Sequence, residues 1–544
     1  MDSSVVADYP AICRTLPALL AWLEEPRADK GVRFASDGGQ WAFRSYAELA
    51  AASRQAASGL MALGVRSNDV VSLALHSGPE FVSAFFGAML AGAVPSAAAP
   101  FTRFQRQSAY TLYTRGILAT VRPRVVIAES ASVFAFGSAR LSGAPRVVTF
   151  GELLRRAPAS SPSPPDPAAG ALLQLTSGSS GFQRAVRVPL QALLNNVRAI
   201  HRWLHWSEND TFVSWLPLHH DMGLVGALLC ATVAQSSLWL LRPEHFIRDP
   251  DRYVRCFGAG GGTLSTIASW GIEYITRRVS QHALASLDLS EWKALVVGAE
   301  RINADALRRF QQLLEPFGLR RGVLLPAYGM AEASLAVTGL ALGQEWTSVH
   351  TSDGEVVGCG SPLSDVTVEL VADSGVSAPQ PSVGEIVVRS PALASGYVGA
   401  GHSSSATRLR RGVLHTGDAG LLVDGQLFPL GRFGDSVKVR GRALFAEDVE
   451  LVAVRHGVPR ARVAALLGMH REAPTVVVVI EKMNCAPALL AKQLRELTAG
   501  AELVVLPVAG GTILRTSSGK PRRRALWSAY LQGNLASLGE HTAC

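Results

Sequence analysis

The sequence predicts an α/β protein with a large N-terminal part and a small C-terminal part of mixed helices and strands. Helical patches alternate with short apolar runs from about residue 45, which is typical of parallel sheets covered by helices. After residue 355 the apolar segments become shorter and β-rich. At about 150 residues per domain, a chain of 544 residues has room for three or four folding units.

The elements of the first part follow from apolar periodicity. We expect helices at 45–63, 79–90, 189–204 and 304–314, and strands at 70–75, 124–128, 211–215, 237–241, 263–267, 294–297 and 323–326. Residues 156–170 are rich in Pro, Ser and Ala, so they form either a domain linker or a loop inside one large domain.

The second part contains a clear turn signal. Asp424 and Gly425 separate two apolar runs and predict a β-hairpin. Strands are also expected at 366–371 and 385–389, and then at 463–467, 475–481 and 503–508 with a helix at 487–497. The last group predicts a separate α+β domain.

Composition excludes several classes of protein. Hydrophobic residues make up 48% of the chain and charged residues 17%, which excludes global disorder. The net charge of +9 suits an anionic small molecule or an acidic carrier protein as well as nucleic acid, so it decides little. The six cysteines are far apart, which argues against a zinc module. No leader peptide or membrane span is expected, and we predict a cytoplasmic protein.

Two motifs suggest phosphate binding. A strand-like run leads into Thr176, Ser177, Gly178, Ser179, Ser180 and Gly181, where hydroxyl and backbone N–H groups in a tight loop can surround phosphate oxygens. Near the end of the chain, Lys520 follows Ser and Gly, which suits an ammonium directed at phosphate. Taken alone, the first motif is also compatible with a surface loop and the second with a solvated basic tail.

Four further motifs follow predicted strands or turns. They contain His220 in LPLHHDMG, Glu300 in GAER, Glu332 in YGMAEAS, and Asp418 in TGD with Arg432 in GRFGD. Tyr328 can stack on a flat ring, Glu332 can bind a hard cation such as Mg²⁺, and Asp418 can hold the hydroxyls of a ribose. Each also has a structural reading, such as a carboxylate favoured at a helix N-terminus for Glu332.

The order and spacing of these motifs resemble the adenylate-forming superfamily of acyl-CoA synthetases, adenylation domains and luciferases. Within it, the chain looks most like the fatty acyl-AMP ligases, on the strength of SWLPLHHDMGL, ASWGIEY, VVGAERI and YGMAEAS. The resemblance implies a large N-terminal domain (1–431) of two α/β lobes and a small β lobe. It also implies a small mobile α+β domain (432–544) that carries the catalytic lysine.

The resemblance also implies a role for each motif. Residues 176–181 would hold the ATP phosphates, Glu332 would bind Mg²⁺, and His220 would gate the acyl pocket. Asp418 and Arg432 would hold the ribose, and Lys520 would contact the α-phosphate. Gly298, Ala299, Glu300 and Arg301, together with Tyr328, would frame the adenine, and Gly329 and Met330 would also belong to the nucleotide site.

Some positions depart from the family pattern. Gln183 and Arg184 replace the usual Pro-Lys, and Gly434 occupies the hinge position where Lys or Asp is usual. The segment between Ser334 and Cys359 is shorter than the insertion of fatty acyl-AMP ligases. The bulky Trp270 and Tyr274 are expected to shorten the acyl pocket.

The predicted function is ATP-dependent activation of a carboxylic acid, fatty or aryl, to an acyl-adenylate. The acyl group would then pass to the phosphopantetheine thiol of a carrier protein acting in trans; no nucleic-acid partner is expected. The alternatives are a CoA ligase, a diazotising enzyme that activates nitrite, and a non-catalytic nucleotide-binding protein.

Overall fold

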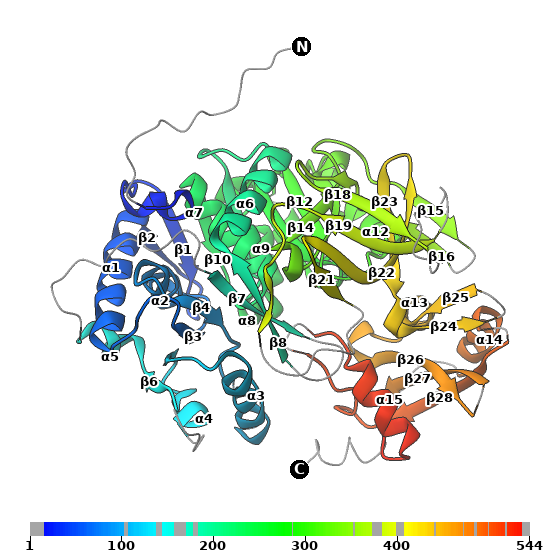
Figure 1. Ribbon diagram of the computed structural model, residues 1–544. Coiled ribbons are helices and arrows are strands. Elements are labelled where there is room, and N and C mark those ends of the chain that lie inside the picture. Colours follow the sequence, from blue (N-terminus) through cyan, green and yellow to red (C-terminus); the bar gives the residue numbers. More distant parts are fainter. Residues whose placement is uncertain are drawn as a thin grey trace.

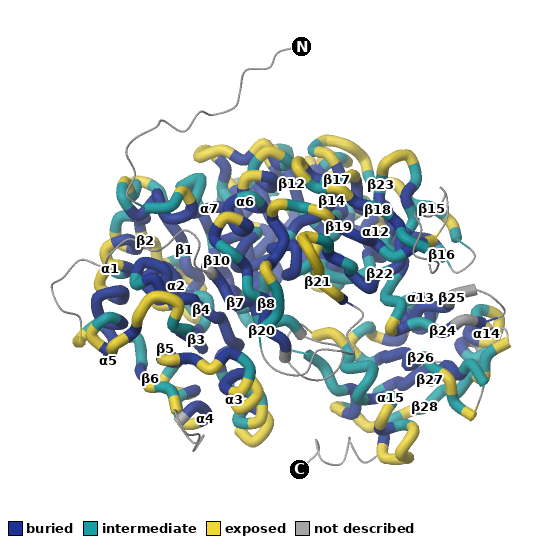
Figure 2. Tube along the Cα trace, in the orientation of Figure 1, coloured by how far each residue is buried: buried dark blue, intermediate teal, exposed yellow. Residues whose placement is uncertain are grey.

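The computed structural model describes residues 16–102, 107–137, 144–156, 170–177, 183–285, 287–351, 354–372, 383–398, 407–439, 442–471, 473–482, 487–498, 500–516 and 519–535. Within these residues the chain forms two α/β lobes, a β lobe and a small C-terminal α+β part (Figure 1). The predicted fold class is therefore confirmed. The strands are mostly buried, and the exposed stretches follow the outside of the molecule (Figure 2).

The first lobe is built on a parallel sheet of four strands in the order β4-β3-β5-β6. These strands are β3 (Val70–Ala74), β4 (Val94–Ala97), β5 (Val125–Ala128) and β6 (Arg146–Val148). Its helices are α1 (Tyr46–Ala62), α2 (Pro79–Leu90), α3 (Gln107–Val121), α4 (Val133–Gly137) and α5 (Phe150–Leu154). Ser45 and Glu48 form a capping box at the start of α1, which explains why the helix begins there.

The second lobe contains a nine-stranded sheet in the order β17-β14-β13-β12-β11-β9-β10-β1-β2. The strands from β13 to β1 are parallel, and the edge strands β2, β14 and β17 are antiparallel. The parallel strands are β1 (Gly31–Ala35), β9 (Thr211–Ser214), β10 (Ser237–Leu240), β11 (Leu264–Ala268), β12 (Ala294–Gly298) and β13 (Leu324–Gly329). The edge strands are β2 (Trp41–Ser45), β14 (Ala336–Gly339) and β17 (Ser361–Pro362).

Helices cover both faces of this sheet. They are α6 (Leu190–Leu204), the π-helix η2 (Met222–Leu229), α7 (Cys230–Ala234), α8 (Pro243–Arg248), α9 (Pro250–Val254), α10 (Ser269–Arg278), α11 (Gln281–Leu284) and α12 (Ala304–Leu314). Side chains of one strand alternate between the faces, so Val296 of β12 packs with α6 and η2 while Leu295 and Val297 pack with α10 and α12. We call these two packed regions the first core and the second core.

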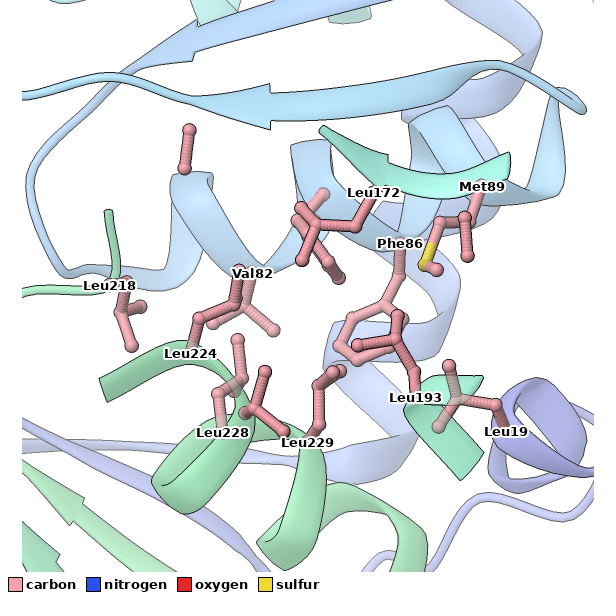
Figure 3. Packing of buried hydrophobic residues seen from close by; sticks show 14 of the residues in the cluster. Leu19, Val82, Phe86, Met89, Leu172, Leu193, Leu218, Leu224, Leu228 and Leu229 are labelled. Carbon is pink, nitrogen blue, oxygen red and sulfur yellow. The ribbon is translucent and has the colours of Figure 1, made fainter. Parts of the chain in front are cut away.

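The first core also joins the two α/β lobes. Val82 and Phe86 of α2 belong to the same cluster as Leu224 and Leu228 of η2, and Val82 lies beside Leu224 (Figure 3). Leu172 of β7 (Gly170–Ser177) lies in the same cluster. The two α/β lobes therefore share a buried surface, which holds the motifs of one lobe in place relative to those of the other.

The β lobe is antiparallel, with β18 (Thr367–Val371), β19 (Gly384–Arg389), β22 (Val413–Val423) and β21 (Arg408–Arg410) in that order and β23 (Gln426–Arg432) paired with β22. The predicted hairpin is confirmed. Asp424 and Gly425 both have positive φ, 49° and 74°, as a two-residue turn of this kind requires. A small sheet of β7, β8 (Gln183–Pro189) and β20 (Gly396–Val398) and the hairpin of β15 (Ser348–Thr351) and β16 (Gly354–Val357) lie beside it.

The C-terminal part follows β23 and lies against the β lobe (Figure 1). Its elements are β24 (Ser436–Val439), β25 (Arg442–Phe445), α13 (Ala446–Arg455), β26 (Val463–His470), β27 (Ala473–Glu481), α14 (Pro487–Leu497), β28 (Glu502–Val508) and α15 (Arg523–Leu531). Between β23 and β24 lies an exposed Gly434, in a short 3₁₀ turn (Phe433–Asp435). A domain boundary after residue 431 and a hinge at Gly434 stay predictions.

Candidate active site

A cavity of about 1470 Å³ opens between the second lobe, the β lobe and the C-terminal part. It begins at the C-terminal ends of β12 and β13, where ligands of parallel sheets usually bind. Predicted site residues from both ends of the chain line it: Thr176, His220, Gly298, Ala299, Glu300, Tyr328, Gly329, Met330, Glu332, Asp418, Arg432 and Lys520. Gly178, Ser179, Ser180 and Gly181 lie outside the described residues, as does the side chain of Ser177.

Asp418 is held on both carboxylate oxygens. Asp418 of β22 is paired with Arg432 of β23, whose Nε donates to Oδ1 at 3.0 Å. The hydroxyl of Tyr328 donates to Oδ2 at 2.7 Å. Burial and the charge of Asp418 raise the pKa of Tyr328 well above its usual value, so Tyr328 stays a neutral donor.

Glu332 is a buried carboxylate in the cavity wall. It lies in a short 3₁₀ turn (Ala331–Ala333) after β13 and is 6% exposed. The hydroxyl of Tyr397 on β20 donates to Glu332 Oε1 at 2.6 Å, and the Arg184 guanidinium lies 3.5 Å from the centre of the Tyr397 ring. Sequence reasoning missed Tyr397, because a tyrosine on a short β segment carries no distinctive pattern.

The turn after β12 brings the backbone close to the cavity. Ala299 has φ +68°, which is uncommon for a residue other than glycine. On the neighbouring strand β13, the last residue, Gly329, has no room for a side chain. A Cβ there would lie 1.9 Å from the Leu335 carbonyl oxygen, so the backbone would have to shift. Glu300 accepts from the Trp270 backbone N–H at 2.9 Å, and its other carboxylate oxygen lies 3.6 Å from Arg460 Nε in the C-terminal part.

His220 lies just before η2 and faces the cavity. Its Nδ1 is 2.8 Å from Asp221 Oδ1, which also accepts from the Met222 backbone N–H at 2.8 Å. Burial raises the pKa of Asp221, but His220 and Lys520 outweigh it and the net shift is downward. Burial lowers the pKa of His219 to about 3, so that ring is neutral at physiological pH.

Lys520 enters the cavity from the C-terminal part. The Thr516 backbone N–H donates to the Lys520 carbonyl at 2.8 Å, and the Lys520 N–H donates to Thr516 Oγ1 at 3.1 Å. These bonds fix the backbone of the lysine. Enclosure by protein and the charge of Arg432 lower the pKa of Lys520, although Glu300, Asp221 and Asp418 act in the opposite direction.

Arg523, part of the basic cluster after Lys520, is not a free surface charge. Its side chain is 13% exposed and pairs with Asp435 at 3.0 Å, Glu447 at 3.1 Å and Glu450 at 2.9 Å. These contacts tie the start of α15, which follows the lysine, to α13 and to the segment after β23. Arg523 therefore supports the lysine loop.

Trp270 and Tyr274 line the cavity from α10 and pack against the second core. The Trp270 ring contacts Trp215 edge-on at 5.0 Å between centroids, and the Tyr274 hydroxyl donates to the Ile247 carbonyl at 2.5 Å. The first-core side of the sheet, where the cavity continues, is a different face. Since both rings line the same cavity, the expectation that they shorten the acyl pocket stays a prediction.

A family model described as AMP-binding enzyme matches residues 24–398, more than half of the chain. The chain belongs to the AMP-binding enzyme family. This AMP-binding enzyme is thus an ATP-dependent adenylate-forming ligase, as the motif order predicted. No helix among the described residues combines the length and the apolar character that a membrane crossing needs.

Several curated relatives of this AMP-binding enzyme match over most of its length. It is 30% identical to a long-chain-fatty-acid–AMP ligase of Mycobacterium marinum over 85% of this chain and 87% of the relative. It is 29% identical to a putative acyl-CoA synthetase of Caulobacter vibrioides, over 90% of each. It is also 29% identical to a medium-chain-fatty-acid–[acyl-carrier-protein] ligase of Moorena producens, over 67% of this chain and 68% of the relative.

A solved structure from work on fatty acyl-adenylate ligases of E. coli and L. pneumophila is similar to the whole fold. It aligns with a TM-score of 0.87 and 27% identity, covering 95% of this chain and 98% of that chain. The match includes both the large N-terminal part and the small C-terminal part.

Proposed function

We propose that this enzyme activates a fatty acid with ATP and passes the acyl group to the phosphopantetheine thiol of a separate carrier protein. The observation that carries the proposal is that one cavity has a charged end and an apolar end. The charged end contains Asp418, Arg432 and Lys520, which suits a nucleotide. The apolar end suits a hydrocarbon chain and not nitrite.

The apolar end is defined by six residues: Ile200, Trp203, Leu204, Phe212, Val296 and Leu335. Ile200, Trp203 and Leu204 are spaced so that they share one face of α6. Phe212 and Val296 project from the sheet on the first-core side. Since Val296 precedes Gly298 by two residues, the apolar end extends roughly 7 Å behind the strand ends that frame the nucleotide site.

In the proposed first step, a carboxylate oxygen of the acid attacks the α-phosphorus of ATP. A new P–O bond forms, the bond to pyrophosphate breaks, and the leaving group carries away the electron pair. Lys520 and Arg432 would offset the negative charge that builds on the phosphoryl oxygens. His220 would separate the reacting carboxylate from the acyl chain. Asp418, held by Tyr328 and Arg432, would accept hydrogen bonds from the ribose hydroxyls.

Glu332 would contribute to a Mg²⁺ site. Within the described ranges, no group of three or more His, Cys, Asp or Glu side chains is arranged to hold an ion. Mg²⁺ is commonly bound by one or two carboxylates together with phosphate oxygens, so a single buried carboxylate fits its needs. When bound, the ion would neutralise phosphate charge. The protein's own contribution is to fix the orientation of Glu332 through Tyr397.

In the second step, the thiol would attack the acyl carbonyl, form a thioester and release AMP. The Moorena relative, a ligase for acyl-carrier protein, supports a carrier as acceptor. CoA is a second candidate, because the region in which fatty acyl-AMP ligases have an insertion is short in this chain. Among its described elements, the chain between β14 and β17 contains only the β15–β16 hairpin. The similarity to a putative acyl-CoA synthetase favours the same alternative.

The test combines pyrophosphate release with product analysis. The full chain is given ATP, Mg²⁺ and fatty acids, aryl acids or nitrite, followed by holo-carrier protein or CoA. We expect acid-dependent pyrophosphate release with fatty acids and acyl-carrier product. Acyl-CoA as the main product would favour the second candidate, and no turnover with any fatty acid would refute the proposal.

A further inference from the structure

A tryptophan lines the apolar end of the cavity. Trp203 lies in the last turn of α6, one residue before the helix ends at Leu204. Its neighbours Arg202 and His205 are exposed, whereas Ile200, Leu204 and Phe212 are buried in the first core. The wall at Trp203 is therefore near the molecular surface, while the other walls are backed by packed core.

Two contacts hold the indole in place. Its Nε1 donates to the Leu340 carbonyl oxygen at 2.7 Å. The ring also lies so close to Gly339 that a Cβ at that position would be 2.2 Å from a ring atom. The glycine at the end of β14 thus provides the space that the ring occupies, and the hydrogen bond fixes its orientation.

We propose that the Trp203 indole closes the apolar end of the cavity and sets the longest acyl chain that the enzyme activates. This inference rests on the proposed function, since it concerns the hydrocarbon of the acid substrate. A chain that reaches the ring cannot bend aside, because the neighbouring walls are core residues at native packing density. Longer acids are excluded until the ring is removed.

The test measures kcat/KM for acid-dependent pyrophosphate release with a graded series of straight-chain fatty acids. Trp203→Ala should raise the preferred chain length by roughly four carbons, because a buried aromatic ring occupies the area of several methylene groups. Trp203→Leu should give a smaller shift. Trp203→Phe keeps a ring but loses the hydrogen bond to Leu340, so its preferred length should stay close to that of the wild type.

A matched control is Trp527→Ala in the C-terminal part. The Trp527 ring also packs on a glycine, since a Cβ at Gly468 would lie 2.6 Å from it, but it is far from the apolar end in the fold. This variant should leave the chain-length preference unchanged. If the wild type activates fatty acids and the alanine and leucine variants at Trp203 keep its preference, the inference is wrong. If the wild type activates no fatty acid, the proposed function itself fails.

Discussion

Replacing Arg301 by leucine should slow adenylate formation by loosening the C-terminal part. Arg301 follows the turn after β12 and pairs with Asp448 in the first turn of α13. The two side chains are only 9% and 2% exposed. Arg301 also donates to the Leu430 carbonyl at 3.2 Å. The pair thus holds the C-terminal part in the orientation that places Lys520 in the cavity.

The magnitude follows from burial. Removing one partner of a buried ion pair costs about 3–5 kcal/mol, because the other charge is left without compensation. Asp448 can recover part of this loss by moving into water if the C-terminal part separates from the lobe. We therefore expect the activation free energy of the first step to rise by about 2 kcal/mol, which lowers the rate of that step by roughly 10- to 100-fold.

The assay is single-turnover formation of acyl-adenylate with excess enzyme. Arg301→Leu combined with Asp448→Leu should be faster than Arg301→Leu alone, since no unpaired buried charge remains. Arg455→Leu is the matched control: it breaks the pair with Asp305, which is 3.5 Å long and 43% and 37% exposed. Exposed pairs contribute about 0–1 kcal/mol, so this rate should change little. A double variant that is no faster than Arg301→Leu alone would refute the reasoning.

Three further outcomes are expected. Lys520→Ala should slow adenylate formation by about 100- to 1000-fold, while transfer from supplied acyl-adenylate changes less. In the wild type the rate of adenylate formation should fall as pH rises through the pKa of Lys520, which is lowered from 10.5, because the lysine loses its charge. This fall at alkaline pH should be absent from the pH–rate profile of Lys520→Ala. Tyr397→Phe should raise the Mg²⁺ concentration needed for half-maximal rate, since Glu332 loses the bond that orients it; an unchanged requirement would contradict this. Burial lowers the pKa of His201 to about 4, so the unfolded chain binds more protons and stability should fall as pH drops from 6.5 to about 4; His201→Gln should flatten this part of a plot of Tm against pH.

Much of the fold was predictable because its signals are local. The apolar runs of β3, β5 and β12 and the turn at Asp424 and Gly425 depend on neighbouring residues, and the structure confirms them. The motifs were also visible in the sequence, and the parallel topology explains why they converge. A parallel sheet places the ends of distant strands along one edge, so Gly298 and Tyr328 line the same cavity without any signal between them.

What the sequence left out depends on contacts between distant segments. Tyr397 becomes a site residue only because β20 pairs with β8 and brings its hydroxyl to Glu332. The ion pairs of Arg523 require α13 and α15 to pack together, and the charge pattern alone suggested a solvated tail. Sequence reasoning also gave no signal for which face Trp270 covers, because helix α10 can lie on either side of a sheet.

The two ends of the cavity have a common cause in strand geometry. Each parallel strand of the second lobe ends at the edge where the nucleotide is proposed to bind, while its middle residues alternate between the first and second cores. A cavity that starts at this edge and follows one face of the sheet must pass from polar turn residues to apolar strand residues within a few ångströms. Val296 and Gly298 of β12 are two residues apart and line these two regions. The position where the proposed nucleotide site meets the apolar region is therefore fixed by the strand register, and under our proposal Trp203 of α6 sets the length of that region.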